Sequence, residues 1–75
     1  MELSKDCNSI FCQRLNELRV DAGVSQEKLG KLLSVSKMAV SHWEKGHSEP
    51  SIAQLLFLAR YFGVDANYLL GYSEY

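Results

Sequence analysis

The hydrophobic residues of this chain recur with the spacing of α-helices. Over about 8–22, four of them fall on one helical face: Phe11, Leu15, Leu18 and Ala22. A second stripe with the same spacing lies over 52–62 and contains Leu55, Leu58, Ala59 and Phe62. No stretch alternates between hydrophobic and polar residues for long enough to predict a β-strand. The pattern therefore predicts an all-α fold.

Capping residues divide the chain into elements. Start signals, in which a hydrophobic residue or proline precedes a side chain that accepts hydrogen bonds from the first turn, occur at Val24-Ser25, Val35-Ser36, Pro50-Ser51 and Val64-Asp65. Ser51 and Gln54 also have the spacing of a capping box. Stop signals, where a residue of positive φ ends a helix, are Gly23, Gly46, Gly63 and Gly71. Together they predict five helices, at about 8–22, 26–33, 37–45, 52–62 and 66–70.

The helix expected at 37–45 has two different faces. At 100° per residue, Val40 and Trp43 project to one side, and we expect them in the core with Leu29, Leu32 or Leu33, Val35 and Leu69. The opposite side is polar and mixed, and it carries Met38, Ser41, His42 and Lys45. This helix therefore has one face for packing and one face free for a partner.

Length and composition predict one small domain. The chain has 75 residues, of which 47% are hydrophobic and 23% charged. We expect the domain to span 8–71, between a flexible N-terminal segment at 1–7 and a C-terminal tail at 72–75. No hydrophobic run approaches the roughly 18 residues of a membrane span, and the N-terminus lacks the features of an export signal. We therefore expect a cytoplasmic protein with no membrane partner.

The sequence contains no constellation typical of an enzyme. Cys7 and Cys12 have no further ligand at metal-binding spacing, so no zinc site is predicted, and we expect Cys12 to be buried and Cys7 more exposed. Neither His42 nor His47 has a carboxylate or a nucleophile at a suggestive spacing. We therefore predict no catalysis and no cofactor, and no small-molecule ligand is evident.

The charge is unevenly distributed along the chain. The net charge is −1, which argues against a strongly cationic protein. Residues 1–23 hold three cations and four anions, residues 24–48 four cations and two anions, and residues 49–75 one cation and three anions. The three segments therefore carry −1, +2 and −2, and the positive charge is concentrated around the 37–45 helix.

From Phe11 to Gly71 the chain resembles the phage repressor and Cro type of helix-turn-helix domain, the XRE-like family. The resemblance is carried by Leu15-x-x-Leu18-Arg19, Gly23-x-Ser25-Gln26-x-x-Leu29, Val35-Ser36, Val40-Ser41-x-Trp43-Glu44-x-Gly46-x-x-x-Pro50, and Leu55 through Gly63-Val64 to Leu69-Leu70-Gly71. It implies a compact five-helix, lambda-repressor-like domain with the helix-turn-helix at about 26–45. In such a domain the 37–45 helix enters the major groove of double-stranded DNA.

The resemblance assigns roles to individual side chains. The predicted base-reading residues are Lys37, Met38, Ser41 and His42, of which Lys37 suits guanine or a phosphate and Met38 suits thymine methyl groups. The predicted phosphate contacts are Gln26, Ser36, Lys45, His47 and Ser48. Arg19 and Glu44 match a structural ion pair of the family.

Gly30 and Ser34 are among the residues that depart from the family pattern. Gly30 replaces a common alanine, and it keeps the small size that a close approach of the two helices needs. Ser34 occupies the turn where the family most often has glycine, so we expect a strained positive φ there.

An aromatic surface on the fourth helix is left unexplained by the core. Phe57 and Tyr61 are neighbours at i and i+4 on nearly the opposite side from the buried stripe. With Tyr68 and Tyr72, they are predicted to form a two-fold homodimer contact. The alternative is a cap of tyrosines that covers the edge of the core.

The leading hypothesis is a DNA-binding transcriptional regulator, a repressor of prophage or mobile-element type, that binds an inverted-repeat operator as a dimer. Two alternatives remain open. The polar face at 37–45 is also consistent with an ordinary solvated helix, and its histidines with single surface residues. The acidic balance and the exposed aromatic residues also fit a protein-interaction module on the same fold, such as an antirepressor or an adaptor.

Overall fold

The computed structural model describes residues 10–74, which form five helices. These are α1 (Ile10–Asp21), α2 (Gln26–Leu33), α3 (Lys37–Lys45), α4 (Ile52–Phe62) and α5 (Ala66–Leu70). The described residues contain no strand, so the predicted all-α class is confirmed. The expected helix bounds are also confirmed for the last four helices, and α1 ends one residue earlier than predicted. The predicted start of α1 lies outside the described residues. The same holds for Cys7 and for the predicted N-terminal segment 1–7.

No helix of the described part is long and hydrophobic enough to cross a bilayer.

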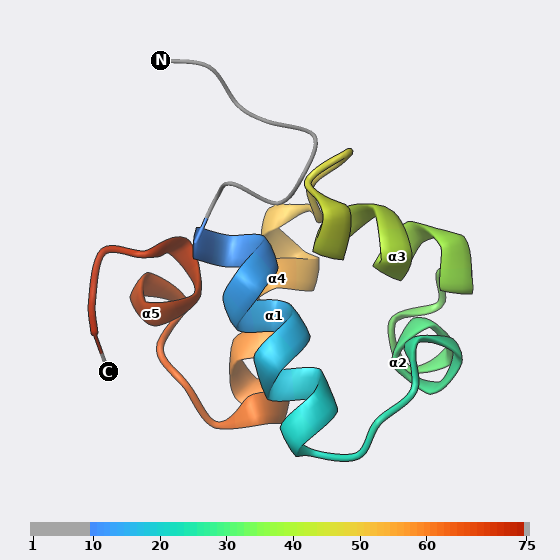
Figure 1. Cartoon of the computed structure of the whole chain (residues 1–75), viewed down its shortest axis with the longest axis horizontal. Coiled ribbons are helices and arrows are strands. Elements are labelled where there is room, and N and C mark those ends of the chain that lie inside the picture. The colour runs from blue at the N-terminus through green and yellow to red at the C-terminus, as the bar shows by residue number, and fades with distance from the viewer. Residues whose placement is uncertain (1–9, 75) are drawn as a thin grey trace.

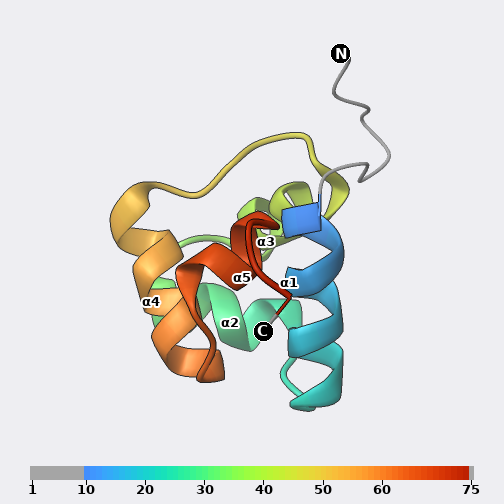
Figure 2. The same ribbon diagram turned by 90° about the vertical axis from the view of Figure 1, so that its left-hand side faces the viewer.

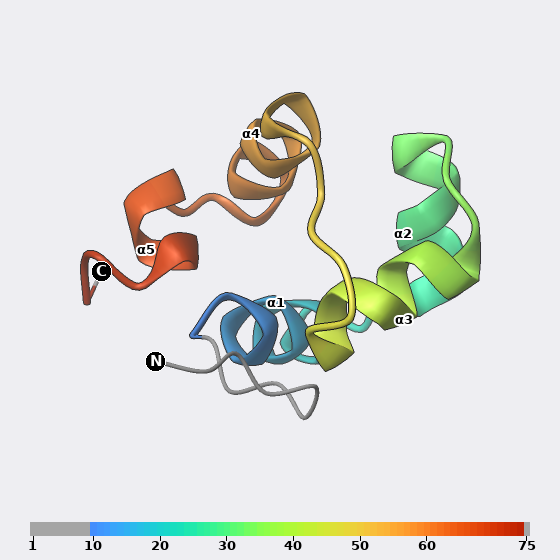
Figure 3. The ribbon, with the colours of Figure 1, turned by 90° about the horizontal axis from the view of Figure 1, so that it is seen from above.

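The first helix packs against helices on two sides. Figure 1 shows α1 between α5 on one side and the α2–α3 pair on the other, with α4 behind it. Two further views confirm that α4 lies on the opposite side of the molecule from α1 (Figure 2) and that α5 and α2 are at opposite ends (Figure 3). α1 packs against both α3 and α5, α2 packs on α3, and α4 packs on α5.

A single hydrophobic cluster joins all five helices. Each helix contributes one fully buried aliphatic side chain, namely Leu15, Leu29, Val40, Leu58 and Leu69. Burial of one such side chain stabilises a fold by about 1.5–3 kcal/mol. Since every helix contributes to this cluster, removing any one helix would expose buried side chains of the remaining helices.

The structure corrects the predicted core at one position. Ala22 is exposed, because the chain leaves the helical path after Asp21. Val24, which follows the turn, is buried in its place. The open choice between Leu32 and Leu33 is also settled, since Leu33 packs against the cluster and Leu32 is exposed.

The predicted capping residues all cap their helices. The side chains of Ser25, Ser36, Ser51 and Asp65 each accept a hydrogen bond from a backbone N–H of the first turn. In the predicted capping box, the Gln54 side chain also accepts from the Ser51 backbone N–H at 2.8 Å. Each such cap contributes about 1 kcal/mol. The helix ends are therefore fixed by local sequence chemistry.

Arg14 of α1 holds the C-terminal end of the described chain. Its guanidinium lies 4.1 Å from the centre of the Tyr68 ring, a cation–π contact. The same group donates hydrogen bonds to the backbone oxygens of Tyr68 and, at 2.6 Å, of Ser73. Tyr72 N–H donates to the Asn67 carbonyl at 2.8 Å. The first residues of the predicted tail are thus tied to α1 and α5.

The turn between α2 and α3 contains a locally strained residue. Ser34 has φ +60°, the only positive φ of a non-glycine residue within 10–74. Opposite it, a Cβ atom on Gly30 would lie 2.8 Å from the Val35 carbonyl oxygen and 3.1 Å from that of Ser36. Both expectations for this turn are confirmed, since Gly30 lets the turn backbone lie directly on α2.

Replacing Ser34 by glycine should stabilise the domain. A left-handed residue with a side chain costs roughly 1–2 kcal/mol, and part of the relief is offset by the greater freedom of glycine in the unfolded chain. We expect Ser34→Gly to raise the free energy of unfolding by about 0.5–1 kcal/mol, measured by urea denaturation. The matched control is Ser48→Gly at an exposed position without positive φ, which should not stabilise. If Ser34→Gly were less stable than the wild type, the positive φ of Ser34 would not be a source of strain.

Candidate nucleic-acid interface

The third helix is fixed from behind by its buried face. Val40 is fully buried and Trp43 is 4% exposed, as the sequence predicted. The Ser36 side chain accepts from Ala39 N–H at 3.1 Å and begins the helix, and Gly46 ends it with φ +78°. A short helix held at both ends and along one side presents its other side in a defined direction.

The outer face of α3 carries the four predicted reading residues. Lys37 and Met38 are exposed, Met38 to 61%. Ser41 and His42 are half-buried one turn later. Because residues four apart share a face, 37 lies beside 41 and 38 beside 42. The structure thus places all four residues on one continuous surface of α3.

The residues predicted to contact phosphate surround that surface at different points. Lys45, His47 and Ser48 are exposed at the end of α3 and in the following loop. Ser36 is exposed, but its side-chain oxygen is already an acceptor for the helix cap. Gln26, at the start of α2, is half-buried, and its amide donates a hydrogen bond to Glu44 at 3.0 Å.

Two histidines of this surface lie side by side. The rings of His42 and His47 have centroids 5.6 Å apart and planes tilted by 48°. Sequence spacing did not indicate the contact, because the two histidines are five positions apart and the helix ends between them. The turn at Gly46, closed by the bond from His47 N–H to the His42 carbonyl at 2.9 Å, brings the loop back along the last turn of α3.

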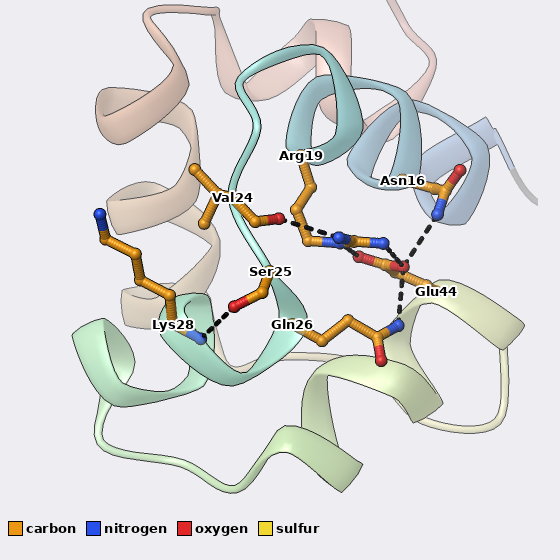
Figure 4. Close-up of polar contacts among 7 residues, drawn as sticks. All are labelled: Asn16, Arg19, Val24, Ser25, Gln26, Lys28 and Glu44. Atoms are coloured by element: carbon orange, nitrogen blue, oxygen red, sulfur yellow. Dashed lines mark hydrogen bonds and ion pairs between the residues drawn. The ribbon is translucent and has the colours of Figure 1, made fainter.

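A buried carboxylate connects α3 to α1 and α2. The Glu44 side chain is 4% exposed and forms an ion pair with Arg19 of α1, whose side chain is 14% exposed. Glu44 Oε2 accepts from Arg19 Nε, and Oε1 accepts from Arg19 Nη2 at 3.1 Å. Figure 4 shows this bidentate pair, together with the bond from Arg19 Nη1 to the Val24 carbonyl at 2.9 Å.

Two amide side chains complete the coordination of Glu44. Asn16 of α1 and Gln26 of α2 each donate to Oε1 at 3.0 Å, from opposite sides of the carboxylate (Figure 4). Sequence reasoning missed Asn16, although its position three residues before Arg19 places both side chains on the same face of α1. The buried charge is therefore satisfied by three residues from two helices.

These partners stabilise the charged form of Glu44. Burial by itself raises the pKa of the carboxyl group, but hydrogen bonds from Arg19, Asn16 and Gln26, with the positive charge of Arg19, outweigh it. The pKa of Glu44 therefore lies below its ordinary value of 4.5. The folded state holds this group as a carboxylate.

The family model and the relatives that match this chain are of the helix-turn-helix or repressor type. A helix-turn-helix family model matches residues 15–69. The HTH-type transcriptional activator BcrR of Enterococcus faecalis is 34% identical over 64 residues, which are 85% of this chain and 31% of BcrR. Repressor protein C2 of Salmonella phage P22 is 34% identical over 58 residues, which are 77% of this chain and 27% of C2. The matched part of this chain thus covers less than a third of the length of either relative.

A solved structure is similar over most of both chains. It is the crystal structure of the P22 c2 repressor protein in complex with a synthetic operator. The TM-score is 0.77 at 32% sequence identity, and the match covers 84% of this chain and 96% of that chain.

The pH dependence of stability should report on Glu44. Because its folded pKa lies below the unfolded value, its contribution is fully present above about pH 4.5 and is lost as the pH falls through the folded pKa. We expect the free energy of unfolding, measured by urea denaturation between pH 7 and pH 2, to fall in that window. Glu44→Gln should be less stable at pH 7 and should depend less on pH below 4.5.

The matched control is Glu17→Gln, which changes an exposed carboxylate on α1. It should keep the wild-type pH profile. If Glu44→Gln also kept that profile, the buried ion pair would not be the group that responds to acid.

Proposed function

This chain belongs to the helix-turn-helix family, and from this membership we propose that it acts as a sequence-specific DNA-binding transcriptional regulator. The XRE-like resemblance and the five-helix, lambda-repressor-like fold expected from the sequence are both confirmed. We further propose a repressor of prophage or mobile-element type, in line with the phage repressor among its relatives. The observation that carries the proposal is the outer face of α3, which is polar, continuous and fixed from behind.

In the proposed complex, α3 enters the major groove. This groove admits one helix and presents a distinct pattern of donors, acceptors and methyl groups for each base pair. Lys37, at the start of the helix, donates to guanine O6 and N7, and exposed Met38 contacts thymine methyl groups. Ser41 and His42 reach the next bases along the groove. These four side chains set the sequence that is recognised.

The neighbouring polar residues hold the DNA backbone. Glu44 fixes the Gln26 amide through one N–H, and the amide nitrogen carries a second N–H that can donate to a phosphate. The N-terminus of α2 adds unpaired backbone donors at the same place. At the other end of α3, phosphate is contacted by three exposed side chains, those of Lys45, His47 and Ser48.

The modest charge of this surface favours a dimer. A net +2 over residues 24–48 neutralises few phosphates, so one copy alone binds weakly. Phe57 and Tyr61 of α4 are 38% and 40% exposed, and their rings stack with centroids 6.1 Å apart. We assign the dimer contact to this pair and to Tyr72, which is 83% exposed. Tyr68 contributes from beneath Arg14, where it is half-buried.

A two-fold dimer of this kind requires an inverted-repeat operator. Symmetry places the two reading helices about 34 Å apart, one turn of B-DNA, so the half-sites repeat at that spacing. Selection of bound sites from random duplexes tests this directly, because the enriched sequences should be palindromes with half-site centres about 10 base pairs apart. Enrichment of no sequence at all would contradict the proposed function.

The runner-up function is a protein-interaction module with little DNA affinity. The stacked Phe57–Tyr61 pair on an otherwise acidic C-terminal part favours it. Salt distinguishes the two, since DNA binding weakens steeply with salt through counterion release and an aromatic protein contact does not.

The reading face should control discrimination between sequences. We expect Lys37→Ala or His42→Ala to reduce the preference for the selected operator over random DNA by about 1–3 kcal/mol per contact, with the fold unchanged. Competition binding assays and circular dichroism measure the two quantities. Arg60→Ala is the matched control, because Arg60 is exposed on α4, away from α3. If both variants discriminated between operator and random DNA as the wild type does, the proposed base contacts of Lys37 and His42 would be wrong.

The aromatic pair should control self-association. We expect Tyr61→Ser to shift the protein from dimer to monomer in analytical ultracentrifugation and to weaken operator binding while leaving the half-site sequence unchanged. Ile52→Ser, at a residue of α4 that is 78% exposed, is the matched control and should keep the dimer. A wild-type protein that remains a monomer both alone and with operator would contradict the dimer.

A further inference from the structure

Behind α3 lies a hydrophobic cavity that none of the proposed base-reading residues lines. Its volume is about 450 Å³, within the range of about 300–1,000 Å³ that small-molecule sites occupy. Four helices contribute hydrophobic side chains to its walls, namely Phe11 of α1, Trp43 of α3, Leu55 of α4 and Leu70 of α5. The loop from α3 to α4 closes one side with Pro50.

The polar part of the wall has a single ionisable group. Glu49 lines the cavity, and among the residues of its wall within 10–74 no other can carry a charge. Ser51 also lines it, but its hydroxyl oxygen already accepts the N–H of Gln54 at 3.1 Å as the cap of α4. Glu49 is exposed and, within the described part of the chain, has no hydrogen bond or ion pair. The described wall of the cavity therefore combines aromatic and aliphatic side chains with the negative charge of Glu49.

We propose that this cavity is a binding site for a small hydrophobic amine. The hydrophobic body of the ligand contacts Phe11, Trp43 and Leu55 and displaces water from these side chains, which is favourable in proportion to the area covered. The ammonium group pairs with the Glu49 carboxylate, which selects a cation over a neutral or anionic molecule of the same shape. The sequence alone did not indicate this site.

The position of the site links it to the reading helix. Trp43 forms part of the cavity wall and also anchors the buried face of α3. Gly46 and Ser48, which follow the helix, line the same cavity. A bound ligand therefore contacts α3 from the side opposite to its exposed face.

Nuclear magnetic resonance titration of the full chain tests the proposal without DNA. The probes are 1-naphthylmethylamine, the neutral 1-naphthalenemethanol and the anionic 1-naphthoate. The chain has one tryptophan, so the Trp43 indole N–H gives a single assigned resonance. We expect saturable shifts of this resonance and of the Gly46 and Ser48 amides, with the amine bound about two- to fivefold more tightly than the alcohol and the naphthoate bound most weakly.

Two matched variants identify the charge that selects the amine. Glu49→Gln should remove the preference of the amine over the alcohol, while Glu27→Gln, an exposed carboxylate on α2 that does not line the cavity, should keep it. The proposal is overturned by three results: no saturable shift, equal affinity for amine and alcohol, or shifts near Phe57 and Tyr61 only. Shifts of the cavity resonances on raising the protein concentration alone would also overturn it, because a second copy would then fill the cavity.

Discussion

A buried carboxylate at the end of α3 is the constraint on which the arrangement of the first three helices depends. A charge removed from water is costly by several kcal/mol unless it is paired and fully hydrogen-bonded. Glu44 meets this requirement only when Asn16 and Arg19 of α1 and Gln26 of α2 all lie within reach. Hydrophobic contacts are non-directional, whereas these hydrogen bonds have defined directions. The core therefore holds the helices together, and Glu44 fixes how α3 is presented.

Most of the fold was predictable because its signals are local. Caps such as Ser51 with Gln54, and glycines such as Gly63 at φ +68°, act within one turn of the chain, so their positions in the sequence determine the helix ends. Two contacts that sequence reasoning missed join distant residues. Arg14 bonds a carbonyl 59 positions away, and Asn16 reaches Glu44 across 28 positions. No periodicity encodes such pairs, since they exist only after the helices have packed.

The candidate site was predictable in outline for a related reason. Helical geometry alone separates the packing face of α3 from its exposed face, and the structure has the same division. Periodicity did not indicate the hydrogen bonds of the surrounding side chains, such as the bond from the Gln26 amide to Glu44.

If α3 reads DNA as proposed, the low positive charge of this region affects how the domain distinguishes its operator from random DNA. Non-specific binding is almost entirely electrostatic, so a surface with few cations is retained less by random sequence.

The turn beneath α3 has a consequence for how the domain folds. Glycine inside α2 weakens that helix by about 1 kcal/mol relative to alanine, and Ser34 adds a conformation that is unfavourable for its residue type. Eight residues are also too few for a stable helix in isolation. The α2–turn segment therefore has little structure of its own and becomes ordered only when it packs against α3. Folding of this part is therefore cooperative with the rest of the domain, so the unit of α2, the turn and α3 is either complete or absent.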